Sequence, residues 1–165
     1  RTVITRTAPL CDESDVANPS LWQATSSGKV DFLELYTGSS RMSHSCADIG
    51  LTVGPPIDLR TCQVSTLEEG DEVFCRAWQQ VVSQEPDVIL MTPEFNPWLP
   101  VSRLHKERKS QHRVVKFCCQ IAAYQNAHGR RFVLMHPEAS GIWNLGEVTG
   151  LLGLMDITWN NLDLK

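Results

Sequence analysis

The chain has 165 residues, of which 42% are hydrophobic and 21% are charged, and its formal net charge is −4. This length predicts a single domain that buries a sizeable core. The mild acidity argues against a protein that bulk positive charge holds on nucleic acid. The sequence contains no apolar run of about 18 residues, so no membrane span is expected.

The first 29 residues differ in amino-acid composition from the rest of the chain. They are rich in Thr, Ser, Asp, Asn and Pro, and their main apolar anchors are Leu10, Leu21 and Trp22. We expect residues 1–29 to form an extended leader or arm, which packs through Trp22 on its own domain or on another protein subunit. Residues 30–165 are expected to form one domain, cut from a longer chain.

Short apolar runs and amphipathic segments alternate through the first half of this domain. Ser39 or Ser40 is a suitable N-cap for the first helix, and Gly50 is suited to end it. The predicted elements are a strand at Val30–Tyr36, a turn at Thr37–Ser40, a helix at Arg41–Ile49, a short strand at Leu51–Gly54 and a helix at Glu68–Gln84.

The second half continues the alternation. The apolar runs at 88–91 and 132–135 predict strands that are buried on both faces. The first predicted elements are a strand at Val88–Met91, a proline-rich, rigid loop at Thr92–Pro100, a long helix within 102–128 and a strand at Arg131–Met135. They are followed by a turn or helix that starts at Ala139–Trp143, a helix at Leu145–Leu154 and a last strand at Met155–Trp159.

This order predicts an α/β fold of three layers, Rossmann-like, with a mostly parallel sheet and helices on both faces. Ligands of such folds bind beyond the carboxyl ends of the strands. We therefore expect a site among the loops at Tyr36–Ser40, Pro55–Thr61, Thr92–Pro100 and His136–Trp143.

Six cysteines are present, too few for a disulfide scaffold in a domain of this size. We interpret them as free, mostly buried thiols. A zinc site built from Cys118, Cys119 and a histidine is a minor alternative, and no metal is expected. The amino-terminal segment lacks the apolar run of a signal peptide, so we expect an intracellular, reducing compartment.

Basic residues gather only near the start of the long helix. They are Arg103, His105, Lys106, Arg108, Lys109, His112, Arg113 and Lys116. This strip is either a solvated helix face or a local site for phosphates, with Arg103, Lys106, Arg108, Lys109 and Arg113 as the nucleic-acid contacts. Arg130 and Arg131 are expected to cap the end of the same helix.

Three motifs, in order, carry a family resemblance. The run Phe32–Arg41 resembles the first motif of S-adenosylmethionine-dependent methyltransferases. Asp87–Pro93 resembles the strand and loop that act on the target base in cytosine-5 DNA methyltransferases, and Gly129–Pro137, followed by Trp143, resembles the next strand. The whole, over about residues 30–143, looks most like methyltransferase-like domains in retroelement polyproteins of protists, particularly dinoflagellates.

The resemblance implies S-adenosylmethionine as a cofactor. A glycine in the loop after the first strand lets backbone amides approach the ligand, and Asp58 is the carboxylate that would accept hydrogen bonds from the ribose. The implied cofactor residues are Glu34, Tyr36, Thr37, Gly38, Ser39, Asp58, Thr92 and Pro93.

The two chemical groups of cytosine-5 methylation are missing, however. The family has a cysteine after the proline of the target loop, where this chain has Glu94, and a glutamate at the end of the next strand, where it has Met135. Because the reaction needs a nucleophilic thiolate and an acid, cytosine-carbon methylation is not expected.

A different methyl acceptor would need other catalytic groups. The run Asn96-Pro97-Trp98 is similar to the loop of amino-methyltransferases, in which Asn96 would hold an amine and Trp98 would stack on its base. Alternatively, this is a rigid loop with Trp98 in the core. Glu94 is either a base or a solvated carboxylate, and His136 is either a site-facing group or a structural one.

Two functions are consistent with these features. The first is a degenerate methyltransferase-like domain, a pseudoenzyme that serves as a structural or binding module in a larger polyprotein or assembly. The alternative is an active S-adenosylmethionine-dependent methyltransferase that acts on a nucleic-acid or other amine.

Overall fold

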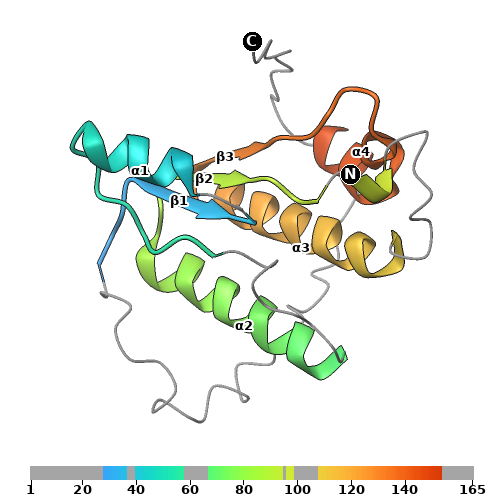
Figure 1. Ribbon diagram of the computed structural model, residues 1–165, viewed down its shortest axis with the longest axis horizontal. Helices are drawn as coiled ribbons and strands as arrows, with labels where there is room; N and C mark the ends of the chain where they lie inside the picture. The colour runs from blue at the N-terminus through green and yellow to red at the C-terminus, as the bar shows by residue number, and fades with distance from the viewer. Residues whose placement is uncertain (1–27, 37–39, 58–66, 95, 99–107, 154–165) are drawn as a thin grey trace.

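The computed structural model describes residues 28–36, 40–57, 67–94, 96–98 and 108–153, without the side chains of 67–72 and 108–110 (Figure 1). Residues 1–27 of the arm predicted at 1–29, and the predicted last strand at Met155–Trp159, lie outside the described residues. In chain order the elements are β1 (Phe32–Leu35), α1 (Arg41–Asp48), α2 (Leu67–Gln84), β2 (Val88–Met91), the 3-10 helix η3 (Asn96–Trp98), α3 (Arg108–Ala127), β3 (Arg131–Leu134), the 3-10 helix η5 (Gly141–Asn144) and α4 (Gly146–Gly153).

The three strands form one parallel sheet in the order β1-β2-β3. This confirms the predicted α/β class and the parallel pairing. On the other side of β1, Val53 and Ile57 form isolated parallel bridges with Phe32 and Leu35. The strand predicted at 51–54 is therefore only a bridge, because two prolines follow it and a proline has no N–H to continue a ladder.

Side-chain alternation along β1 places helices on both faces of the sheet. Glu34 points toward α1, where its carboxylate accepts hydrogen bonds from Ser43. Leu33 and Leu35 point to the opposite face, into the core cluster that includes Val81 of α2. Helix α1 thus covers β1 on one face, while α2 and α3 pack on the other (Figure 1).

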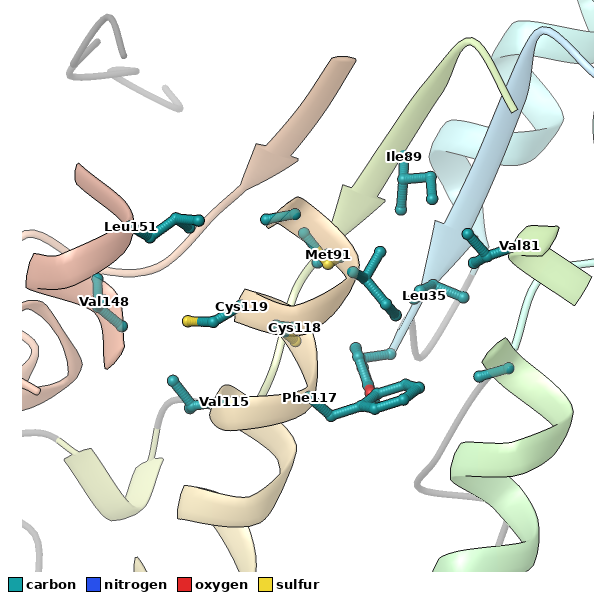
Figure 2. Packing of buried hydrophobic residues seen from close by; sticks show 14 of the residues in the cluster. Leu35, Val81, Ile89, Met91, Val115, Phe117, Cys118, Cys119, Val148 and Leu151 are labelled. Carbon is teal, nitrogen blue, oxygen red and sulfur yellow. The ribbon is translucent and has the colours of Figure 1, made fainter. Parts of the chain in front are cut away.

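The hydrophobic core lies between the sheet and the three helices α2, α3 and α4. Figure 2 shows Leu35, Ile89 and Met91 of the sheet facing the apolar side of α3. Each fully buried aliphatic side chain contributes about 1.5–3 kcal/mol. The other labelled members are Val81, Val115, Phe117, Cys118, Cys119, Val148 and Leu151.

Three buried glutamines lie near the amino-terminal edge of the sheet. The side-chain amide of Gln125, on α3, donates to the carbonyls of Pro86 (2.8 Å) and Arg131 (3.1 Å), just before β2 and at the start of β3. Gln80 binds Gln84 at 3.1 Å at the end of α2. Since buried amides cost free energy unless they are hydrogen-bonded, the two Gln125 contacts hold the starts of β2 and β3 next to α3.

Strand β3 differs from its prediction. Arg131 and Val133 are exposed, Val133 to 44%, whereas Phe132 and Leu134 are only half-buried. The apolar run suggested burial on both faces. Within the described residues β3 is instead the outer strand, and its main helix contact is with α3.

The end of α3 agrees with the sequence. Gly129 follows the helix with a φ of 68°, a conformation that glycine adopts without strain. The Arg130 guanidinium donates to Gln125 (2.9 Å) and lies 5.3 Å from the centre of the Tyr124 ring. Arg130 thus packs against the last turn of the helix, as predicted, whereas Arg131 begins β3.

Candidate functional site

The carboxyl ends of the three strands meet at one edge of the sheet. Backbone hydrogen bonds continue past the strands there: Tyr36 donates to Ile57 (2.7 Å), Thr92 to Leu35 (3.2 Å) and Met135 to Met91 (3.0 Å). Four chain segments are therefore held side by side at this carboxyl edge.

The order in which successive segments join the sheet reverses at β1. The segment that contains Val53 and Ile57 pairs on one side of β1, and β2 pairs on the other. In open parallel sheets, ligands bind beyond the carboxyl ends of the strands at such a point. Of the implied cofactor residues, Thr37, Gly38, Ser39 and Asp58 lie outside the described residues. Tyr36, Thr92 and Pro93 follow the ends of β1 and β2 at this point, and Glu34 lies within β1.

Tyr36 marks the end of β1. Its φ of 69° is unusual for a residue with a side chain, and Ser40, which precedes α1, has a φ of 49°. The Tyr36 ring is buried in the core beside Cys118, and burial, followed by the neighbouring thiol, raises the pKa of its hydroxyl well above the ordinary value. Tyr36 thus presents only its backbone at the carboxyl edge.

The Glu34 carboxylate forms a structural contact with Ser43 of α1. Its side chain is 5% exposed, and its Oε2 accepts hydrogen bonds from the Ser43 backbone N–H (2.7 Å) and hydroxyl (2.5 Å). A carboxylate oxygen that accepts two donors of one residue holds α1 against β1. Glu34 can support a ligand loop through α1, but it does not reach toward the carboxyl edge.

The loop after β2 lies directly on the carboxyl edge. The Thr92 hydroxyl donates to the Tyr36 carbonyl at 3.3 Å, and Pro93 is buried. The half-buried Glu94 accepts a hydrogen bond from the exposed Asn96 backbone at 3.2 Å. These contacts give the loop a fixed course from β2 into η3.

The structure brings Glu94 and His136 together from two different loops. Burial lowers the pKa of His136 to about 4, while a backbone hydrogen bond and the negative charge of Glu94 act in the opposite direction. The imidazole also stands edge-on to Trp143, with ring centres 6.1 Å apart, and Trp143 donates to the Pro137 carbonyl (2.8 Å). His136 is therefore neutral at neutral pH and able to accept a proton only weakly.

Trp98 points into the protein. The side chain is 7% exposed and makes an edge contact with His112 of α3, at 6.4 Å between ring centres. A methyl group added to Gly141 would lie 3.8 Å from Cε3 of Trp98, so η5 packs close to the same ring. A ring held in this way has no free face on which a substrate base can stack.

The described side chains of the basic strip contact two different helices. His112 approaches Glu147 of α4 at 3.2 Å, and Arg113 lies 5.7 Å from the ring centre of Phe74 on α2. Lys116 is exposed. Arg103 and Lys106 lie outside the described residues, and the side chains of Arg108 and Lys109 are not described. Of the five predicted contacts, only Arg113 can be placed, and it packs partly on a phenylalanine.

The described cysteines are poor nucleophiles. Burial, followed by the charge of Glu147, raises the pKa of Cys119 to about 12, and burial raises that of Cys118 well above its ordinary value. For Cys46, on α1, burial and Glu34 also raise the pKa. These three thiols are free, as predicted. Cys75 is disulfide-bonded, which corrects the prediction that the cysteines are free thiols.

Sequence reasoning missed two residues that shape this region. Ser43 was not recognised as the partner of Glu34, because a serine within a polar helix face has no distinguishing pattern. Glu147, which pairs with His112, follows the first residue of α4. An acidic residue in the first turn of a predicted helix is the signal that could have identified it.

A scan against protein-family models gives no match, and neither the curated proteins nor the solved structures contain a match to the chain. Among the described helices, none is both long enough and apolar enough to cross a membrane. In the same part of the chain, no three His, Cys, Asp or Glu side chains are grouped so that they could hold a metal ion.

Proposed function

We propose that the chain is a methyltransferase-like α/β domain, three-layered and Rossmann-like, that serves as a structural or binding module in a larger polyprotein or assembly. It keeps the carboxyl edge of a cofactor-binding fold and lacks the groups that transfer a methyl. The sequence motifs support the relationship, and the parallel sheet with its reversal at β1 is consistent with it.

The burial of Trp98 is the observation that carries this proposal. An amine methyltransferase of the suggested type needs an aromatic ring that stacks on the acceptor, yet Trp98, the last residue of η3, packs against α3 and η5. Freeing it would cost about 3–5 kcal/mol, the range for emptying a buried aromatic site. This cost disfavours the loop as an acceptor clamp.

Thiol chemistry is disfavoured independently. Methylation at carbon requires a thiolate at the target loop, and Pro93 is followed there by Glu94. The free cysteines on α3 point into the core and have raised pKa values. Within the described residues, the chain therefore lacks a free aromatic ring for methylation of an amine and a thiolate at the target loop for methylation of carbon.

The alternative function is an active methyltransferase. Its support comes from the carboxyl edge itself, where positive φ values at Tyr36 and Ser40 flank the loop that contains Gly38. Residues in such sparsely populated conformations concentrate at ligand-binding sites. Under this alternative, Glu94 and His136 are the groups nearest to an acceptor.

A methyl-transfer assay distinguishes the two functions. The 165-residue chain is incubated with S-adenosylmethionine labelled in the methyl group and with single-stranded DNA, duplex DNA, RNA or a lysine-rich peptide as acceptor. The proposal predicts no labelled acceptor above the background without protein. Transfer that is lost in His136→Gln or Glu94→Gln, and kept in the distant surface variant Ala123→Ser, would establish the alternative.

A further inference from the structure

Among the described residues, the outer edge of β3 has backbone groups that form no hydrogen bond to another segment. Arg131 and Met135 donate to Asp87 and Met91 at 3.0 Å, so alternate residues of β3 face β2. The N–H and C=O groups of Phe132 and Leu134 therefore point away from the sheet. Within the described residues, no hydrogen bond joins these groups to another part of the chain.

The side chains along this edge combine an apolar centre with opposite charges at the two ends. Val133 is 44% exposed at the middle of the strand. Arg131 is exposed at its start, and Glu138 is exposed shortly after its end. Neither charge forms an ion pair in the described part of the chain. An exposed apolar residue beside open ladder groups is the typical feature of an edge that accepts another strand.

We propose that β3 pairs antiparallel with β3 of a second copy of this chain, about a two-fold axis that passes between the two Val133 residues. In this register Phe132 of each copy exchanges both backbone hydrogen bonds with Leu134 of the other. All the outward groups of the two residues are then satisfied, and the two sheets become one continuous sheet.

The charges select this arrangement over a parallel one. Antiparallel pairing directs Arg131 of one copy toward the strand end near Glu138 of the other, whereas parallel pairing sets Arg131 beside Arg131. Like charges directly opposite destabilise a strand pair, and opposite charges stabilise it. The edge is therefore complementary to itself under a two-fold axis, which is the commonest symmetry of homodimers.

The central contact is apolar. Two residues that face each other without hydrogen-bonding have Cα atoms about 4.5 Å apart, so the two Val133 side chains touch. A four-residue strand gives a small interface, below the roughly 1,200 Å² of stable complexes. The association is therefore weak and depends on concentration.

Sedimentation velocity over a concentration series, up to about 1 mM, tests this inference with a matched pair of variants. Val133→Lys places like charges at the two-fold axis, and Ile49→Lys places the same charge on an apolar residue that is 77% exposed, after α1. Wild type and Ile49→Lys are expected to move from monomer toward dimer together. For Val133→Lys the dissociation constant is expected to rise at least about tenfold.

The inference is overturned if wild type stays monomeric over the whole series, or if both variants dimerise like wild type.

Disulfide cross-linking tests the register of the two paired strands. A Cα separation of about 4.5 Å lies within the range that a disulfide spans. Under mild oxidation Val133→Cys should therefore form a covalent dimer that neither wild type nor Ile49→Cys forms. Equal amounts of cross-linking in the three proteins would contradict the proposed two-fold axis. The carboxyl edge takes no part in either experiment, so these results do not depend on the proposed function.

Discussion

The contact between Glu34 and Ser43 offers a sharp test of how α1 is held on the sheet. Ser43→Ala removes the hydroxyl that donates to the buried carboxylate at 2.5 Å and leaves the backbone donor at 2.7 Å in place. Hydrogen bonds to charged groups contribute about 1.5–3 kcal/mol. We expect Ser43→Ala to lower the free energy of unfolding by about 2 kcal/mol, close to the lower part of that range.

The companion variant Glu34→Gln keeps the volume and removes the charge. Its cost should exceed that of Ser43→Ala, because the amide weakens both hydrogen bonds and brings a donor that has no acceptor in this contact. The double variant should cost less than the sum of the two single ones, since the residues act on one interaction.

Urea unfolding followed by circular dichroism measures these differences directly. For a chain of this length, 2 kcal/mol also lowers the melting temperature by about 4–8 °C. Ser45→Ala, on the exposed side of the same helix, is the control and should change stability by less than about 0.5 kcal/mol. Additive effects of Glu34→Gln and Ser43→Ala would refute the contact as the anchor of α1.

Three further predictions concern packing, pH and thiol reactivity. Gly54→Val should destabilise the protein by about 1–3 kcal/mol in urea unfolding, because the added Cβ would lie 2.4 Å from Oε1 of the buried Gln84; an unchanged midpoint would contradict this packing. Stability should fall as the pH decreases from about 6.5 to 4, because the pKa of His136 is lowered from 6.5 to about 4 and the unfolded chain binds the proton first. His136→Gln should lose less stability over that interval, and an equal loss would show that His136 titrates normally. In the native state Cys118 and Cys119 should resist a thiol reagent until denaturant is added, and rapid labelling of either would contradict their burial.

The sequence contained enough information for the element order and the parallel sheet. Helix α2 and strand β2 were predicted almost to the residue, because a stripe at helical spacing and a four-residue apolar run are strong local signals. The burial of β3 was not predictable in the same way. Whether Val133 is covered depends on which other segment lies against the strand, and that is a property of the tertiary arrangement.

The loops of the candidate site follow from the rule on strand ends. The structure places the described parts of the loops after β1, β2 and β3 at one edge of the sheet, and ligand binding there stays a prediction. The pairing of Glu34 with Ser43 could not be read from the chain, because it depends on how α1 lies across β1. The orientation of Trp98 was open for the same reason, since a proline-flanked tryptophan can stack on a ligand or fill a core.

The proposed function holds that the domain keeps a methyltransferase-like fold and does not use the cofactor. The most direct test is the melting temperature of the chain with and without S-adenosylmethionine. The account predicts a change below about 1 °C at millimolar ligand. A ligand at 100 times its dissociation constant would stabilise the fold by about 2.7 kcal/mol, or about 5 °C or more. A saturable rise of that size, lost in Gly38→Trp and kept in Ala123→Trp, would contradict the account.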